Sequence, residues 1–179
     1  MEKRLTFAYG RALIVSRFMV LGALVVSASV GIAVLPPLSP GLVAVPAALL
    51  AVYFLLFAVS PLLTDHWLTR SRLVLRQGWY FRVVLPLSDV EDIQLVDHAS
   101  PGQIPLGIHR PLGRSVLYAT GARTGLVSVR LRSPRRFWQS FGLPATEIVF
   151  DVRQPTQLIE AIEERRRLLA PVEPDRPDA

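Results

Sequence analysis

Arginine is the residue type with which this chain could do most of its chemistry, since Lys and Arg number 20 against 14 acidic residues. A guanidinium group donates in a planar fork that matches the oxygens of phosphate and carboxylate. Seven arginines stand on, or directly after, stretches of alternating apolar and polar residues: Arg72, Arg76, Arg82, Arg130, Arg132, Arg135 and Arg136. Near a membrane, each could attract anionic lipid headgroups by about 1 kcal/mol. The sequence favours the alternative of a solvated face, whose charge is balanced by Asp89, Glu91, Asp92 and Asp97.

Histidine and aspartate supply the other side chains that could do chemistry. Asp65–His66, Asp97–His98 and His109 are the candidates for metal binding or acid–base catalysis. None of these pairs has the i, i+4 spacing of metal ligands on a helix, and the chain contains no cysteine. It also lacks a Gly-rich phosphate loop, a G-x-S-x-G turn and an H-E-x-x-H helix. We therefore expect no metal site, no cofactor and no catalytic residue, and a protein that is not an enzyme.

The segment from His98 to Gly113 is rich in proline and glycine and is long for a loop in a small domain. Its apolar residues are candidates for an interface: Ile104, Leu106, Ile108 and Leu112. They could enter a lipid–water interface or contact a partner. The alternative is that they pack over the open end of the domain.

Three aromatic residues, Phe137, Trp138 and Phe141, follow Arg135 and Arg136. Aromatic side chains beside basic ones can anchor a protein at a lipid–water interface, and Trp138 is a candidate for this role. They could equally form a hydrophobic plug between strands. The combination also suits nucleic acid, but the charge of this part of the chain is nearly balanced, so we expect no nucleic-acid partner.

These candidate residues flank a long uncharged segment, because residues 18–63 contain no charged side chain. Only the hexapeptide 36–41, with three prolines, interrupts its apolar character. A helix needs about 20 apolar residues to cross about 30 Å of hydrocarbon. The sequence therefore predicts an N-terminal lead (residues 1–13) and a transmembrane helical hairpin (residues 14–63) with spans at about 14–35 and 42–63. A cleavable signal peptide is the alternative for the first span, but a second span follows at once.

Basic residues occur on one side of the two predicted spans: Lys3, Arg4, Arg11 and Arg17 before the first, and Arg70, Arg72 and Arg76 after the second. The positive-inside rule then predicts that both termini lie in the cytoplasm. Arg17 stands at the boundary and could extend its guanidinium to the headgroups.

Small residues recur along one face of each predicted span: Ala23, Ser27 and Gly31, and Ala44, Ala47, Ala48 and Ala51. Small side chains let helices approach closely in lipid. We favour packing of the two spans on each other over a dimerisation face. Neither span carries a mid-span Asp, Glu, Lys or His, so transport is not expected.

After residue 64 the pattern changes to alternation by two, which is typical of half-buried strands. The clearest case sets Val127, Val129 and Leu131 against Ser128, Arg130 and Arg132. Pro155 then suits a first helical position, and Leu158, Ala161 and Ile162 share one face of the helix that follows. The sequence predicts a domain over residues 64–170 with several antiparallel strands and one amphipathic helix, then a disordered tail over 171–179.

Four segments of this domain resemble bacterial pleckstrin-homology-like (PH-like) domains. They are residues 63–69, 72–78 and 85–93, which resemble the opening strands and turns, and residues 150–162, which resemble the closing strand and helix. Two departures are Gln154, where the family has an Asp that caps the helix, and the longer insertion at 97–113. The resemblance implies a seven-strand barrel closed by a helix, often fused to two transmembrane helices. It implies no shared catalytic residues.

The expected fold class is α+β: an N-terminal transmembrane hairpin, then a PH-like antiparallel β-barrel or sandwich capped by a C-terminal helix. We expect a non-catalytic, multi-pass protein of the cytoplasmic (inner) membrane whose domain binds protein or lipid headgroups. The alternative is an accessory subunit that assembles with a larger membrane complex through the barrel or the hairpin. Expected partners are the bilayer, anionic headgroups, and another membrane protein or a second copy of the chain.

Overall fold

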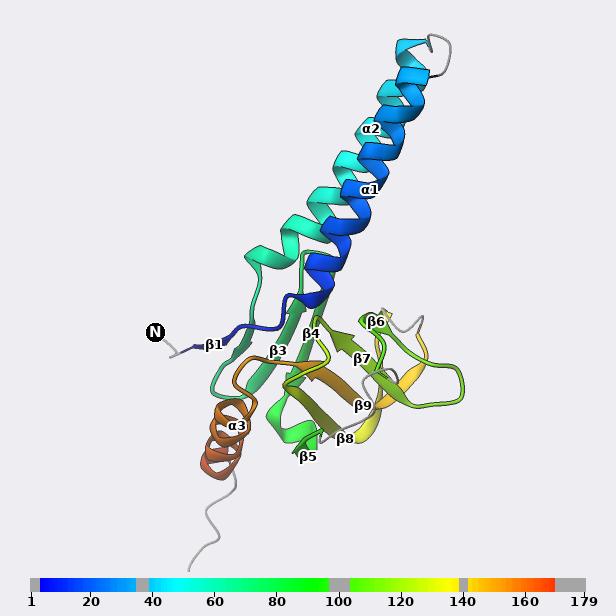
Figure 1. The fold of residues 1–179 in the computed structure, drawn as a ribbon. Helices are drawn as coiled ribbons and strands as arrows, with labels where there is room; N and C mark the ends of the chain where they lie inside the picture. The colour runs from blue at the N-terminus through cyan, green and yellow to red at the C-terminus, as the bar shows by residue number, and fades with distance from the viewer. Residues whose placement is uncertain (1–3, 35–38, 97–103, 139–141, 170–179) are drawn as a thin grey trace, which may run out of the picture.

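The computed structural model describes residues 4–34, 39–96, 104–138 and 142–169 (Figure 1). Several sequence expectations concern residues outside these ranges. They are the first half of the Pro-rich turn (36–41), the first part of the loop with Asp97 and His98, the aromatic residue Phe141, and the tail.

Two long apolar helices lie side by side and project from the rest of the molecule (Figure 1). Helix α1 spans Ala12–Val34 and helix α2 spans Pro40–Phe54, which continues through a π-helical turn, η1 (Leu55–Val59), and a 3-10 turn, η2 (Ser60–Leu63). Two segments, Ala12–Ile32 and Gly41–Leu63, are long and apolar enough to cross a membrane, and only 6% of the most apolar stretch of each is buried. Such exposure is unlike the core helix of a soluble protein.

The first sheet contains four antiparallel strands in the order β1-β2-β3-β4. These are β1 (Leu5–Phe7), β2 (His66–Leu68), β3 (Arg72–Gln77) and β4 (Phe81–Pro86). Strand β1 lies in the predicted N-terminal lead and pairs with β2, with Phe7 opposite His66. The helical hairpin is therefore an insertion between two neighbouring strands, so both of its ends are attached to the same sheet.

The second sheet has the order β5-β8-β9-β7-β6. Its strands are β5 (Val90–Leu95), β6 (Gly107–His109), β7 (Val116–Thr120), β8 (Leu126–Arg136) and β9 (Pro144–Asp151), and the 3-10 turn η3 (Leu87–Asp89) precedes β5. Uniformly antiparallel strands were expected, but β7 and β9 are parallel. The reason is topological. Strand β9 lies between β7 and β8 in the sheet and is antiparallel to β8, and it therefore runs in the same direction as β7.

The two sheets share one hydrophobic core, which confirms the expected α+β class with its two apolar helices at the N-terminus. Phe81 and Leu75 from the first sheet and Phe150 and Val129 from the second are almost completely buried. Helix α3 (Pro155–Leu169) begins at the predicted proline and covers this core with two fully buried residues, Leu158 and Ile162. The expected alternation in β8 is also confirmed, since Val127, Val129 and Leu131 are buried while Arg130 and Arg132 are exposed.

Gly125, in the turn between β7 and β8, gives a direct test of this packing. Its φ is +66°, and a Cβ at this position would overlap the carbonyl oxygen of Val152. Gly113 has a similar φ of +79° but nothing within 4 Å of such a Cβ. We expect Gly113→Ala to cost about 1 kcal/mol of left-handed strain, and Gly125→Ala to cost a further 1–3 kcal/mol, roughly, from overpacking.

Denaturant unfolding of the purified protein, followed by tryptophan fluorescence, measures both costs. Because the two glycines share the same backbone strain, their difference isolates the contact with Val152. Equal costs for the two substitutions would contradict the close approach of this turn to the end of β9.

Candidate functional interface

One end of the β domain meets the base of the helices, and we name it the helix-proximal end. It comprises the β3–β4 turn at Gln77–Gly78, the end of β7 at Thr120–Gly121, and the end of β9 at Asp151. Three hydrogen bonds define it: Gly78 N–H donates to Thr64 Oγ1 (2.9 Å), Leu13 N–H to the Gly121 carbonyl (2.8 Å), and Gly10 N–H to Asp151 Oδ2 (2.5 Å). The opposite, helix-distal end comprises η3, Arg72, Val116 and Pro144, which lie at the other ends of the same strands.

Asp151 joins the start of α1 to the second sheet. Its side chain is 1% exposed, and its two carboxylate oxygens accept the backbone N–H groups of Gly10 and Gly121. These segments approach closely, because a Cβ on Gly121 would lie 2.5 Å from the Gly10 carbonyl oxygen. Burial raises the pKa of Asp151 to about 6, against the effect of these hydrogen bonds, which favour the carboxylate.

The end of the second helix is held by the segment before α1 and by the β3–β4 turn. The Tyr9 hydroxyl donates to the Pro61 carbonyl at 2.5 Å, and burial raises the pKa of Tyr9 to about 12. From the turn, Trp79 N–H donates to Ser60 Oγ at 3.1 Å. The helix base is therefore attached through backbone groups that irregular structure would otherwise leave without partners.

Arg17 connects both helices to the domain. Its Nη1 donates to the Phe57 carbonyl (2.6 Å) and to the Tyr80 hydroxyl (2.8 Å), and its guanidinium lies 5.6–5.7 Å from the ring centroids of these two residues. The sequence placed Arg17 at the boundary of the span with a guanidinium that could extend to the headgroups, and in the structure this guanidinium is partnered within the protein. Trp79, next to Tyr80, is 58% exposed.

His66, one of the residues considered for metal binding, is a fully buried packing residue. Its Nδ1 accepts the Arg76 N–H (3.1 Å), and its ring stacks on Tyr9 and meets the edge of Phe150 at centroid distances of 5.1 and 5.4 Å. Burial lowers the pKa of His66 to about 4. His109 lies exposed on β6, and across the described ranges no group of three or more His, Asp or Glu side chains could hold a metal ion.

Exposed arginines gather at the helix-proximal end. Arg11 directly precedes α1, and Arg123 lies in the β7–β8 turn. Arg153 is two residues beyond the end of β9 and donates its N–H to the Ala8 carbonyl. Asp65 is the exposed carboxylate that we find at this end within the described parts of the chain. Because the three arginines come from distant sequence positions, only the fold brings them together.

The guanidinium groups of three further arginines surround Trp67 on the outer face of the first sheet. Those of Arg4, Arg76 and Arg82 lie 3.7, 5.2 and 6.0 Å from its ring centroid. Arg76 and Arg82 are opposite each other and next to the β3–β4 turn. They are the two members of the sequence-predicted set that lie at the helix-proximal end.

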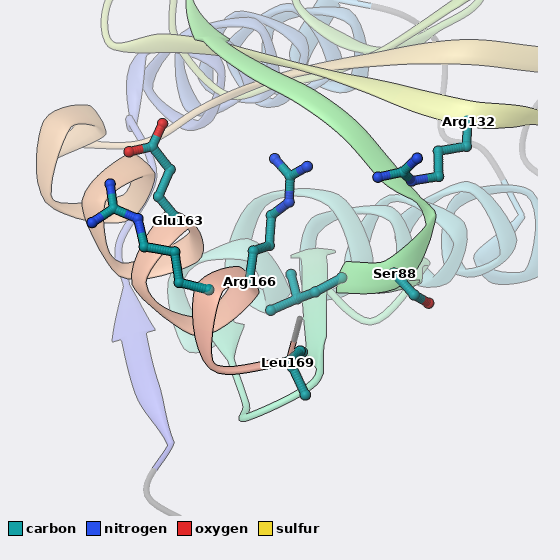
Figure 2. A pocket seen from close by; sticks show the side chains of 7 residues that line it. Ser88, Arg132, Glu163, Arg166 and Leu169 are labelled. Carbon is teal, nitrogen blue, oxygen red and sulfur yellow. The ribbon is translucent and has the colours of Figure 1, made fainter. Parts of the chain in front are cut away.

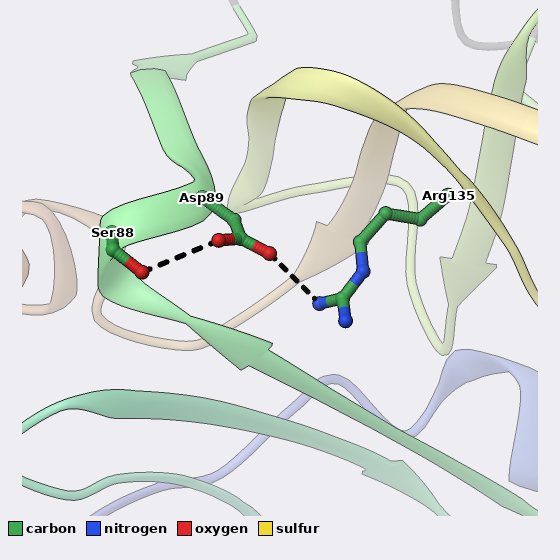
Figure 3. A network of polar contacts seen from close by, with 3 residues as sticks. All are labelled: Ser88, Asp89 and Arg135. Atoms are coloured by element: carbon green, nitrogen blue, oxygen red, sulfur yellow. Dashed lines mark hydrogen bonds and ion pairs between the residues drawn. The ribbon is translucent and has the colours of Figure 1, made fainter.

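The other five predicted arginines lie elsewhere. Arg130 is in mid-strand, directly opposite Asp92 and Glu147. The remaining four lie toward the helix-distal end: Arg72, Arg132, Arg135 and Arg136. There Arg135 forms an ion pair with Asp89 (3.2 Å), and the Asp89 carboxylate also accepts a hydrogen bond from the Ser88 hydroxyl (Figure 3). A six-residue strand such as β3 spans about 17 Å, which is about twice the Debye length at physiological salt. The seven arginines therefore do not form one electrostatic surface.

The four predicted interface residues also separate. Ile104 is buried with Leu126 and Val149, and Ile108 packs against the main core from β6. Leu106 is half-buried and precedes Gly107, which lies near Leu13 and Arg17 at the helix-proximal end.

Trp138 is 80% exposed beyond the helix-distal end of β8, while Phe137 is partly buried against the core. The other apolar residue of the predicted loop, Leu112, is 89% exposed. Packing thus accounts for Ile104 and Ile108. Gly107, between Leu106 and Ile108, is near the helices, since a Cβ at this position would lie 3.8 Å from Leu13.

No family model, curated protein or solved structure matches the chain. The resemblance to PH-like domains therefore stays a prediction. What the fold defines is an α+β domain carried at the base of two apolar helices.

The opposite pKa shifts of His66 and Asp151 generate a prediction about pH. On acidification from pH 6.5 to 4 the unfolded chain binds a proton at His66 and the folded protein does not, so stability falls. Asp151 acts with the opposite sign, since the folded protein binds its proton near pH 6 and the unfolded chain near 3.8. In Asp151→Asn only the effect of His66 remains. Between pH 6.5 and 4 we therefore expect the free energy of unfolding of this variant to fall by on the order of 1–3 kcal/mol more than that of the parent.

Thermal unfolding in a series of buffers measures the two slopes, and Asp65→Asn is the matched control because its carboxylate is exposed. The control should follow the parent. Parallel pH profiles for Asp151→Asn and the parent would refute the assignment of the acid-stabilising effect to this carboxylate.

Proposed function

We propose that the protein is a non-catalytic integral membrane protein of the cytoplasmic (inner) membrane. Its helical hairpin anchors a PH-like domain on the cytoplasmic side, and the helix-proximal end of that domain contacts anionic lipid headgroups. The observation that carries this proposal is the position of Arg11, Arg123 and Arg153, exposed around the base of two helices that are themselves exposed and apolar. A tethered domain keeps such arginines within a Debye length of the headgroups.

The PH-like part of the proposal is supported by two sheets that share one core and by a C-terminal helix over it. Two features depart from the seven-strand pattern of the resemblance. Strand β1 comes from before the hairpin, and β7 pairs with β9 in parallel. Both departures position the helix-proximal end, since β1 leads into α1 and the parallel pair brings Arg123 and Arg153 to the same edge.

The orientation follows from the distribution of charge. All basic residues lie outside residues 18–63, and the helix-proximal end of the domain is arginine-rich, whereas the turn between the helices is uncharged. The positive-inside rule then orients the domain and both termini toward the cytoplasm.

A second candidate function is that of an accessory subunit that associates through the hairpin. An apolar groove of about 680 Å³ lies along the two helices, with Pro46 and Phe54 among its lining residues. On the small-residue face of α1, a Cβ at Gly31 would contact nothing within 4 Å. Close packing of the two spans at Gly31, which we favoured from the sequence, is therefore absent, and a helix of another subunit could approach there.

Because the chain has no cysteine, single cysteines can report the orientation. Ser39, at the start of α2, and Ser88, at the helix-distal end, are both exposed. We expect Ser39→Cys to react with a membrane-impermeant maleimide added to intact cells, and Ser88→Cys to react only after the membrane is permeabilised. The reverse pattern would show that the topology is opposite to the one proposed. Recovery of the protein in the supernatant after high-speed centrifugation without detergent would contradict the proposal of a membrane anchor.

Headgroup contact can be tested with matched arginine variants. One triple variant combines Arg11→Gln, Arg123→Gln and Arg153→Gln. The control triple variant changes three exposed arginines away from the helix base and combines Arg72→Gln, Arg130→Gln and Arg136→Gln. The first set should lower the preference for anionic lipid by about 1 kcal/mol per arginine, and the second should change it little.

The measurement is native mass spectrometry of the full chain taken from nanodiscs of phosphatidylcholine mixed with phosphatidylglycerol. The ratio of the two bound lipids reports the preference. Equal ratios for the parent and both triple variants would reject headgroup contact while leaving the topology intact.

A further inference from the structure

A pocket of about 650 Å³ lies at the helix-distal end, where α3 passes η3 and β8 (Figure 2). It is not part of the headgroup interface proposed above. Its lining residues come from these three elements: Leu87, Ser88, Arg132, Glu163, Arg166, Arg167 and Leu169.

Positive charge is in excess in this pocket. Three guanidinium groups, those of Arg132, Arg166 and Arg167, face one lining carboxylate, that of Glu163. In the part of the chain that the structure describes, none of these arginines forms an ion pair. The pocket therefore has a net charge of about +2 that its own lining leaves uncompensated.

The arginines are also arranged to bind from two directions. Arg166 extends from α3 and Arg132 from β8, on different sides of the pocket (Figure 2). Arg166 is held in place, because its Nη2 donates to the Glu91 carbonyl at 3.1 Å. A guanidinium fixed in this way loses less conformational entropy when it binds an oxyanion.

We propose that this pocket binds an acidic peptide segment of a soluble partner protein, through the carboxylate or phosphate groups of its side chains. Clusters of arginine recognise such segments by charge-assisted hydrogen bonds, which are short and strong. One phosphate or carboxylate group would leave most of about 650 Å³ to water. A peptide with two or more acidic side chains can reach Arg132 and Arg166 together.

The position of the pocket favours a partner in solution over a lipid. Strands β3 and β4 separate it from the base of the helices, and each has six residues, a length of about 17 Å. Headgroups at the helix base are thus about two Debye lengths away and contribute little. The pocket faces the compartment that contains the domain.

The test uses the full chain in nanodiscs of phosphatidylcholine alone and fluorescence anisotropy with two labelled probes. One is a peptide of alternating glutamate and leucine, and the other has glutamine in place of glutamate. We expect the glutamate peptide to bind and the glutamine peptide to bind more weakly by on the order of tenfold. The double variant Arg132→Gln/Arg167→Gln should lose on the order of tenfold in affinity for the first peptide. Both side chains are exposed and remote from the core, so the fold should persist.

The matched control is Arg72→Gln/Arg136→Gln, which removes two exposed arginines near the same end of the domain but outside the pocket. It should bind like the parent. Equal losses in the two double variants would show unspecific charge attraction and overturn the proposal, as would failure of the parent to distinguish the two peptides. If the parent binds neither peptide but a variant with Glu173→Gln, Asp175→Asn and Asp178→Asn binds the acidic one, the occupant is the chain's own C-terminal segment and the assignment to a partner is wrong.

Discussion

The carboxylate of Asp151 connects the parts of the molecule that would otherwise move independently. It ends β9, and it accepts the N–H groups of Gly10, just before α1, and of Gly121, just after β7. The two helices are mostly exposed along their length, so their direction relative to the domain depends on contacts at their base. The two hydrogen bonds of this buried carboxylate are costly to break, because the charge and the N–H donors would then be left unpartnered in the interior.

Around this carboxylate the junction is built mainly from side chains that bind backbone groups. Tyr9 binds the carbonyl of Pro61, Thr64 accepts from Gly78, and Arg17 donates to Phe57. The helix after Phe54 becomes π-helical and then 3-10, which frees backbone groups that need such partners. The insertion of the hairpin between β1 and β2 adds a second constraint. Because Phe7 and His66 are paired at its two ends, a tilt of the helices would strain this strand pairing.

The helical hairpin and most of the strands could be predicted because their signals are local. An uncharged run, alternation in β8 and a proline at the start of α3 depend only on neighbouring residues. Strand β1 was missed because three residues do not establish a period, and β6 because prolines and glycines surround it. Arg123 and Arg153 had no local signal at all. They lie at the same end of the sheet only because β7 and β9 are parallel, which depends on strand order in the finished sheet.

Alternation along the strands is likewise not enough to group the arginines into one surface. Alternation predicts which face of a strand a side chain occupies, but it says nothing about distance along the strand. Arg72 and Arg76 share a face of β3 and yet lie toward opposite ends of it. In water at physiological salt, separations greater than about 8 Å are enough to make two charges largely independent. A domain fixed at its base by Asp151 can therefore present two basic surfaces of different use, one held beside the helices and one kept away from them. That separation depends on the junction being rigid, since a domain free to rotate about its tether would expose both surfaces to the same partners.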